Sequence, residues 1–120
     1  MTKNKLGIIG GSGLYEIEGL ENLKWKTIET PWGNPSDQIL NFNYKGKKVC
    51  FLPRHARGHK ISPTNINFRA NIDALKQSGV TDIVSISAVG SLKENLNPGT
   101  FVLVDQFIDR TFARDKTFFD

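Results

Sequence analysis

The stretch LGIIGGSGLY, residues 6–15, decides which fold the sequence predicts. Its apolar run from Leu6 to Ile9 is typical of a buried β-strand, and this strand leads into a turn of glycine and serine, Gly10 to Gly13. The backbone N–H groups of such a turn, together with the Ser12 hydroxyl, can hold a small oxyanion. The same residues also suit a plain tight turn, so anion binding is one of two interpretations.

Better-known glycine motifs do not fit this turn. Gly11 and Gly13 match the start of a dinucleotide fingerprint, but Glu16 stands where its third glycine belongs. The chain has no P-loop run, and a nucleophile elbow would need glycine at Leu14. Ser12 is therefore not expected to act as a hydrolase nucleophile.

Composition favours one cytoplasmic domain. The chain has 120 residues, of which 38% are hydrophobic and 23% charged, as in ordinary soluble proteins. The single cysteine, Cys50, excludes an intramolecular disulfide and a cysteine-clustered metal site. No apolar run is long enough for a membrane span, so no membrane partner is expected. The net charge of +4 is spread along the chain without a nucleic-acid-binding motif, so no nucleic-acid partner is expected either.

The remaining pattern predicts an α/β fold in which helices cover a sheet. The expected strands are residues 5–10, 23–29, 38–44, 47–52, 81–88 and 100–108. Lys45-Gly46 between two of them indicates a β-hairpin. The β-branched run 81–88 is expected in the buried centre of the sheet.

One helix is expected between these strands. Ser62 is a candidate N-cap with Pro63 at the first helical position, and the helix should continue to about Ser78 before Gly79 ends it. Its predicted apolar stripe is Phe68, Ile72 and Leu75, with Ile66, Ala70 and Ala74 beside it.

Polar residues follow three of the expected strands. Arg54-His55 comes after one strand, and Ser87-Ala88 lies where another ends in a glycine turn. Ligands gather at the carboxyl ends of strands in open α/β sheets, so these residues and Ser12 are expected to converge. Arg54 can hold two oxygens of a phosphate. The alternative is a solvated basic loop that binds no ligand.

A metal site is not expected. His55 and His59 lie four residues apart, but Pro53 and Gly58 argue against the helix that would bring the two rings to one face.

The chain resembles the N-terminal part of the purine nucleoside phosphorylase family, and within it the methylthioadenosine phosphorylases. The matching segments, in family order, are GIIGGSGLY, FLPRHARGH, NFRANIDALK, SAVGSL and PGTFVLVDQFIDRT. The resemblance implies a mixed sheet flanked by helices and a homotrimer when full length. It also implies attack of inorganic phosphate on C1′ of methylthioadenosine, which releases adenine and 5-methylthioribose 1-phosphate. Phosphate is then a co-substrate, and no cofactor is expected.

The resemblance also implies roles for particular residues. Phosphate contacts are expected from Ser12, Arg54, His55, Ser87 and Ala88. Val89 and Gly90 match the turn that lies along the nucleoside.

The sequence departs from the family pattern in two places. Ala56 replaces the glycine usual after Arg-His, and the family's Met-Glu-Gly-Pro segment and base-contacting aspartates are expected beyond Asp120. Residues 1–120 are thus expected to be the N-terminal portion of one phosphorylase domain, apparently truncated and inactive by itself. Alternatives are a phosphorylase for methylthioinosine or other purine nucleosides, a nucleosidase that uses water, and a phosphate-binding module without activity.

Overall fold

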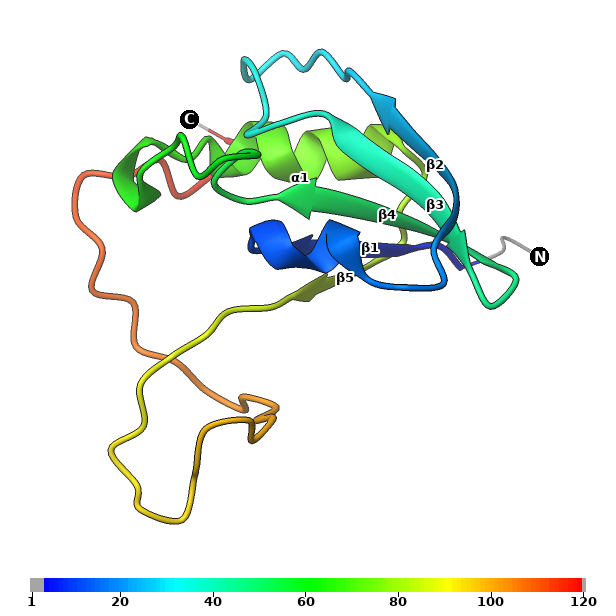
Figure 1. Ribbon diagram of the computed structural model, residues 1–120. Coiled ribbons are helices and arrows are strands. Elements are labelled where there is room, and N and C mark those ends of the chain that lie inside the picture. Colours follow the sequence, from blue (N-terminus) through cyan, green and yellow to red (C-terminus); the bar gives the residue numbers. More distant parts are fainter. Residues whose placement is uncertain (1–3, 120) are drawn as a thin grey trace.

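The computed structural model describes residues 4–119, apart from the side chains of Ser12 and Tyr15. One mixed sheet of five strands forms its centre, in the order β2-β3-β4-β1-β5 (Figure 1). The strands are β1 (Leu6–Gly10), β2 (Glu21–Lys26), β3 (Ile39–Tyr44), β4 (Lys47–Pro53) and β5 (Asp82–Ser85). The helical elements are α1 (Phe68–Gln77) and two short 3-10 helices, η1 (Ser12–Glu16) and η2 (Pro63–Asn65).

Strand β1 runs parallel to both of its neighbours. Gly10 pairs with Pro53 at the end of β4, and Ile9 pairs with Ser85 at the end of β5. The carboxyl ends of β1, β4 and β5 therefore lie at one edge of the sheet, as predicted. The other half of the sheet is antiparallel.

The predicted hairpin is confirmed. Lys45 and Gly46 connect β3 to β4 with φ angles of 46° and 74°. This is the type I′ combination, whose twist matches that of the flanking strands. Residues 23–29 were also predicted as a strand, but β2 begins earlier, at Glu21, and ends at Lys26, with an irregularity at Asn22 (φ 55°).

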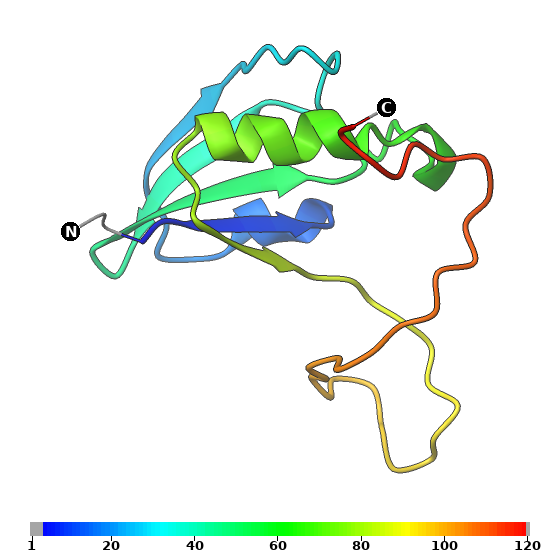
Figure 2. The ribbon, with the colours of Figure 1, turned by 180° about the vertical axis from the view of Figure 1, so that it is seen from behind.

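Both faces of β4 are covered by apolar side chains, which explains its unbroken apolar run. Helix α1 lies over one face of the sheet (Figure 2). Cys50 and Leu52 pack there with Leu75 of α1 in one cluster. Val49 and Phe51 point to the opposite face, because successive residues of a strand alternate, and Leu14 of η1 packs there. Burying side chains of this size stabilises the fold by about 1.5–3 kcal/mol each.

Helix α1 begins later than predicted. Its N-cap is Asn67, whose Oδ1 accepts a 3.1 Å hydrogen bond from the Ala70 N–H, whereas Ser62 precedes η2 and makes no capping bond. The predicted end is confirmed, since Gly79 has the left-handed φ of 81° typical of a helix stop. No helix within residues 4–119 has the length and apolar character that a membrane span requires.

The predicted apolar stripe of α1 is correct only in part. The side chains of Ala70, Ala74 and Leu75 are buried, but Phe68 and Ile72 are 42% and 39% exposed. The helix therefore turns a narrower face to the sheet than the spacing suggested.

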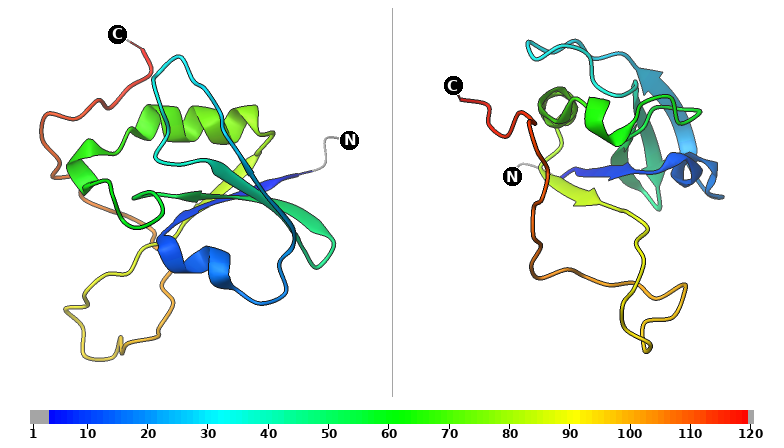
Figure 3. Two further views of the ribbon diagram at one scale, coloured as in Figure 1. Left: turned by 45° about the horizontal axis from the view of Figure 1, so that its top comes forward. Right: turned by 90° about the vertical axis from the view of Figure 1, so that its left-hand side faces the viewer.

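Two predicted strands differ from the structure. Residues 81–88 were expected in the sheet centre, but β5 contains only Asp82–Ser85 and lies exposed at the sheet edge. Residues 100–108 form no strand, and within the described part of the chain no helix or strand follows β5. Figures 1 and 3 show residues 86–112 looping away from the sheet. Phe101 is 96% exposed there, because no described segment pairs with this stretch or covers it.

Candidate functional site

The turns that follow β1, β4 and β5 are joined by direct hydrogen bonds. The Arg54 N–H donates to the Gly10 carbonyl (3.0 Å), and the Ile86 N–H donates to the Ile9 carbonyl (2.8 Å). The Arg54 side chain then crosses to the residues after β5, where Nη1 donates to the Ser87 Oγ (2.8 Å) and Nη2 to the Ile86 carbonyl (3.4 Å). The structure thus brings Arg54 and Ser87 together at this edge.

The charge of Arg54 is not matched by an acid in the described structure. Its recorded side-chain acceptors, Ser87 and Ile86, are neutral, and none of the ion pairs found in residues 4–119 includes it. A guanidinium held by neutral acceptors keeps its attraction for an anion. Arg54 is half-buried, but its side-chain hydrogen bonds to Ser87 and Ile86 lie at the exposed surface.

His55 makes its recorded contacts within its own loop. Its Nδ1 lies 2.8 Å from the Ile61 carbonyl, which can only accept, so Nδ1 carries the proton. Its ring stacks on His59, with centroids 4.5 Å apart and planes at 24°. Nε2 is therefore the nitrogen left for a ligand. In the described residues, no three His, Cys, Asp or Glu side chains gather as a metal site would need.

The loop of residues 54–61 contains backbone conformations that favour glycine. Gly58 has a φ of 78°, but Ala56 and His59 also take left-handed values, 62° and 52°. An L-residue with a Cβ pays for this conformation with roughly 1–2 kcal/mol of strain. Ala56 thus stands at a position where glycine would be unstrained.

The sequence did not reveal a salt bridge that holds this loop. Arg57 Nε and Nη2 donate to the two carboxylate oxygens of Asp37 at 3.0 and 2.9 Å, and the Arg57 N–H donates to the same carboxylate at 2.8 Å. Its guanidinium also lies 4.0 Å from the ring centre of Trp25. No motif signalled the pair, although the predicted hairpin of β3 and β4 places the residues before β3 and those after β4 at the same end of the sheet.

The Asp37 carboxyl is acidified by these contacts. Burial by itself raises its pKa, but the hydrogen bonds from Arg57 and from the Gln38 N–H outweigh that, and the net pKa lies below the ordinary value of 3.8. The carboxylate therefore stays charged through the neutral range.

Three predicted site residues lie on the exposed segment that follows β5. Ala88, Val89 and Gly90 are exposed, Val89 by 85%. The Ser12 side chain lies outside what the structure describes.

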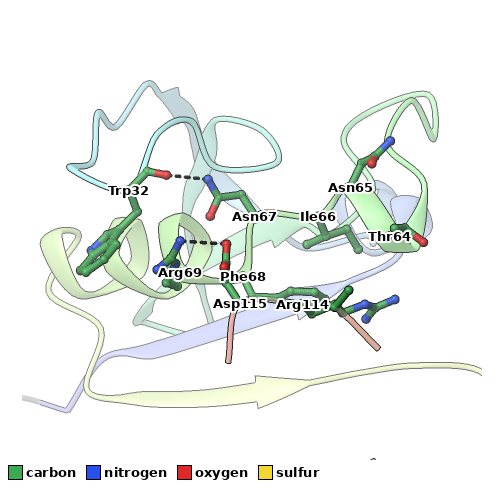
Figure 4. Close-up of a pocket in the computed structure, with 10 residues that line it drawn as sticks. Trp32, Thr64, Asn65, Ile66, Asn67, Phe68, Arg69, Arg114 and Asp115 are labelled. Atoms are coloured by element: carbon green, nitrogen blue, oxygen red, sulfur yellow. Dashed lines mark hydrogen bonds and ion pairs between the residues drawn. The ribbon is translucent and has the colours of Figure 1, made fainter. Parts of the chain in front are cut away.

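A cavity of about 300 Å³ lies elsewhere, between the start of α1 and residues 113–115 (Figure 4). Asn67 Nδ2 donates to the Trp32 carbonyl (2.7 Å) at its rim, and Arg69 pairs with Asp115 (2.8 Å). None of the predicted site residues lines this cavity.

Comparison with known proteins extends over nearly the whole chain. S-methyl-5′-thioadenosine phosphorylase from Rhodospirillum rubrum is 63% identical over 114 residues, which are 95% of this chain and 39% of that protein. The enzyme of the same name from Cereibacter sphaeroides is 62% identical over 117 residues, 98% of this chain and 40% of its own length. This chain thus spans about two fifths of these curated relatives.

A solved structure confirms the fold. Methylthioadenosine phosphorylase from Schistosoma mansoni in its apo form matches with a TM-score of 0.88 at 43% identity, over 97% of this chain and 41% of that one. The family model described as the phosphorylase superfamily matches residues 5–120. A match of this extent shows that the chain belongs to the phosphorylase superfamily.

Proposed function

We propose that this chain forms the phosphate-binding part of a purine nucleoside phosphorylase that cleaves 5′-methylthioadenosine with inorganic phosphate. The observation that carries the proposal is the Arg54 guanidinium, which lies at the carboxyl ends of parallel strands with neutral hydrogen-bond acceptors. The relatives named S-methyl-5′-thioadenosine phosphorylase support the choice of nucleoside.

In the proposed reaction, an oxygen of phosphate attacks C1′ of the sugar while the bond from C1′ to the purine nitrogen breaks. The base takes up a proton, which balances the one that phosphate loses on becoming an ester, and leaves as adenine, and the sugar leaves as 5-methylthioribose 1-phosphate. Phosphate is already an anion at neutral pH, so the protein's main task is to position it. Its charge beside the developing oxocarbenium ion then stabilises the transition state.

The proposed contacts divide between the two substrates. Arg54 supplies the charged donor for phosphate, and Ser12, His55, Ser87 and Ala88 add further donors. The turn at Val89 and Gly90 lies along the nucleoside. Arg54 and Ser87 are preorganised for this role, because their 2.8 Å hydrogen bond fixes the guanidinium before a ligand arrives.

The test is an assay of the complete gene product with 5′-methylthioadenosine, with and without phosphate. We expect adenine and a sugar phosphate only when phosphate is present. Adenine released without phosphate would indicate a nucleosidase, and phosphate binding without adenine release would indicate a binding module. Adenosine and methylthioinosine as competing substrates would define which purine nucleosides are accepted.

We also propose that the complete gene product is a homotrimer. The family resemblance carries this proposal, and the exposed aromatic residues near the chain end, Phe112 and Phe119, offer apolar area for an interface. Light scattering at micromolar concentration tests it, and a monomer would contradict it.

A further inference from the structure

The loop that carries Arg54 and His55 is also held by residues that are not among the predicted phosphate contacts. Arg57 follows His55 by two positions, and its side chain forms a two-pronged pair with Asp37, just before β3. Its Nη2 also donates to the Gln38 side-chain oxygen at 3.0 Å. We call Asp37, Arg57 and Trp25 the loop clamp.

Each carboxylate oxygen of Asp37 in the clamp accepts two hydrogen bonds. Asp37 Oδ2 accepts from the backbone N–H and Nε of Arg57, and Oδ1 accepts from Arg57 Nη2 and the Gln38 N–H (2.7 Å). The Asp37 side chain is only 11% exposed, so solvent competes weakly for these bonds. Trp25 of β2 lies under the guanidinium, which ties the loop to the antiparallel half of the sheet.

The backbone conformation of the loop requires stabilising contacts of this kind. Left-handed backbone at Ala56 and His59 is unfavourable, and persists only where surrounding contacts impose it. The two arginines of the loop have different partners. The Arg57 charge is matched by Asp37, whereas the charge of Arg54 is held by neutral acceptors.

We infer that Asp37 and Arg57 are positioning residues for phosphate: the clamp fixes the loop so that Arg54 and His55 are presented at the strand ends. This inference rests on the proposed function, because it assigns Arg54 and His55 to phosphate. It predicts an effect on phosphate that exceeds any effect on the nucleoside.

The test compares the complete gene product with Asp37→Asn, Arg57→Gln and the double variant. Each single variant should raise the KM for phosphate about tenfold, equivalent to about 1.4 kcal/mol, and leave the KM for the nucleoside near its wild-type value. The double variant should show no larger effect, because each change breaks the same clamp. Arg57→Lys should fall between, since it keeps the charge and loses the fork.

Asp115→Asn is the control, because it breaks another Arg–Asp pair, between Arg69 of α1 and Asp115, outside the loop. Its KM for phosphate should match that of the wild type. Unchanged phosphate KM in both single variants, equal increases for both substrates, or additive effects would overturn the inference.

A second readout does not depend on the reaction. Amide hydrogen exchange of residues 54–61 should be faster in Asp37→Asn than in the wild type or in Asp115→Asn. Unchanged exchange in that loop would overturn the clamp. If the wild type showed no phosphate-dependent cleavage, the proposed function would fail while this readout still decided whether the clamp orders the loop.

Discussion

Arg54 and Ser87 follow strands that are not neighbours in the sheet, yet Arg54 Nη1 donates a 2.8 Å hydrogen bond to Ser87 Oγ. The side chain therefore crosses the end of β1, where the Gly10 carbonyl already accepts from the Arg54 N–H. One residue thus connects the carboxyl ends of three parallel strands. Its charge is therefore held at the edge where β1 leads into the glycine turn.

Arg54→Ala should weaken phosphate binding. The lost contact is a hydrogen bond to a charged group, about 1.5–3 kcal/mol, which is roughly ten- to over a hundredfold in affinity. Arg54→Lys should recover only part, because an ammonium cannot make the two-pronged contact. Phosphate saturation curves on the complete gene product measure both, with Arg114→Ala as the control since Arg114 lies over the Phe68 ring. Equal phosphate dependence in all variants would contradict the assignment of Arg54.

Ala56→Gly should stabilise the fold. The φ of 62° at Ala56 is strained for alanine. The strain energy removed by glycine should exceed the cost of the larger conformational entropy of the unfolded chain by about 0.5–1 kcal/mol. Ala74→Gly in the middle of α1 should have the opposite sign, because glycine is unfavourable there by about 1 kcal/mol even before lost packing. Urea unfolding of each variant gives both values. Destabilisation by Ala56→Gly would contradict backbone strain at Ala56.

The parts of the fold that the sequence predicted correctly have local signals. Strand β1 has an apolar run with a glycine turn after it. The dipeptide Lys45-Gly46 by itself indicates a hairpin turn. Gly79 likewise ends α1 through its own backbone freedom. The convergence of Arg54 and Ser87 also followed from one general rule, that parallel strands share a carboxyl edge.

The parts that were missed depend on distant partners. The Asp37–Arg57 pair joins the residues before β3 to those after β4, at one end of the hairpin, but nothing in either local sequence indicates the other. Asn67 replaced Ser62 as the cap because its side chain is also held by the Trp32 carbonyl. The apolar pattern of residues 100–108 resembles a strand, but the described residues supply neither a ladder partner nor a covering layer.

Asp37→Asn should destabilise the protein at neutral pH and much less in acid. The pKa of Asp37 is lowered in the folded state, so its stabilisation is fully present above the ordinary value of 3.8 and is lost as the pH falls through the folded value. At neutral pH the cost should be about 1–3 kcal/mol, between that of an exposed and a buried pair. The unfolding free energies of wild type and variant should then converge below pH 3.8. Asp115→Asn, at a 75% exposed acid, should cost about 0–1 kcal/mol. A constant difference across the acid range would contradict the role of the carboxylate.

The glycine turn gives a test that separates folding from ligand binding. A Cβ added at Gly10 would collide with the Leu14 side chain, whereas one added at Gly11 would meet no atom within 4 Å. Gly11 has an ordinary φ of −72°, and neither it nor Gly13 is among the left-handed residues, so the positive φ that a glycine turn suggests is absent there.

Gly10→Ala should therefore destabilise the fold by about 1–3 kcal/mol, the usual cost of overpacking. Gly11→Ala should leave stability within about 0.5 kcal/mol, because the backbone and the space both accept a methyl group. If the turn holds phosphate through its backbone, Gly11→Ala should still raise the KM for phosphate, since the methyl group would stand where the anion approaches. Ser12→Ala should weaken phosphate less than Gly11→Ala, by about 0.5–1.5 kcal/mol or up to about 3 for a charged acceptor, and Ser12→Thr should be tolerated because it keeps the hydroxyl. Thermal unfolding and phosphate saturation curves on the same preparations supply both measurements. A stable Gly11→Ala variant with wild-type phosphate KM, together with a silent Ser12→Ala, would show that the turn serves the fold alone.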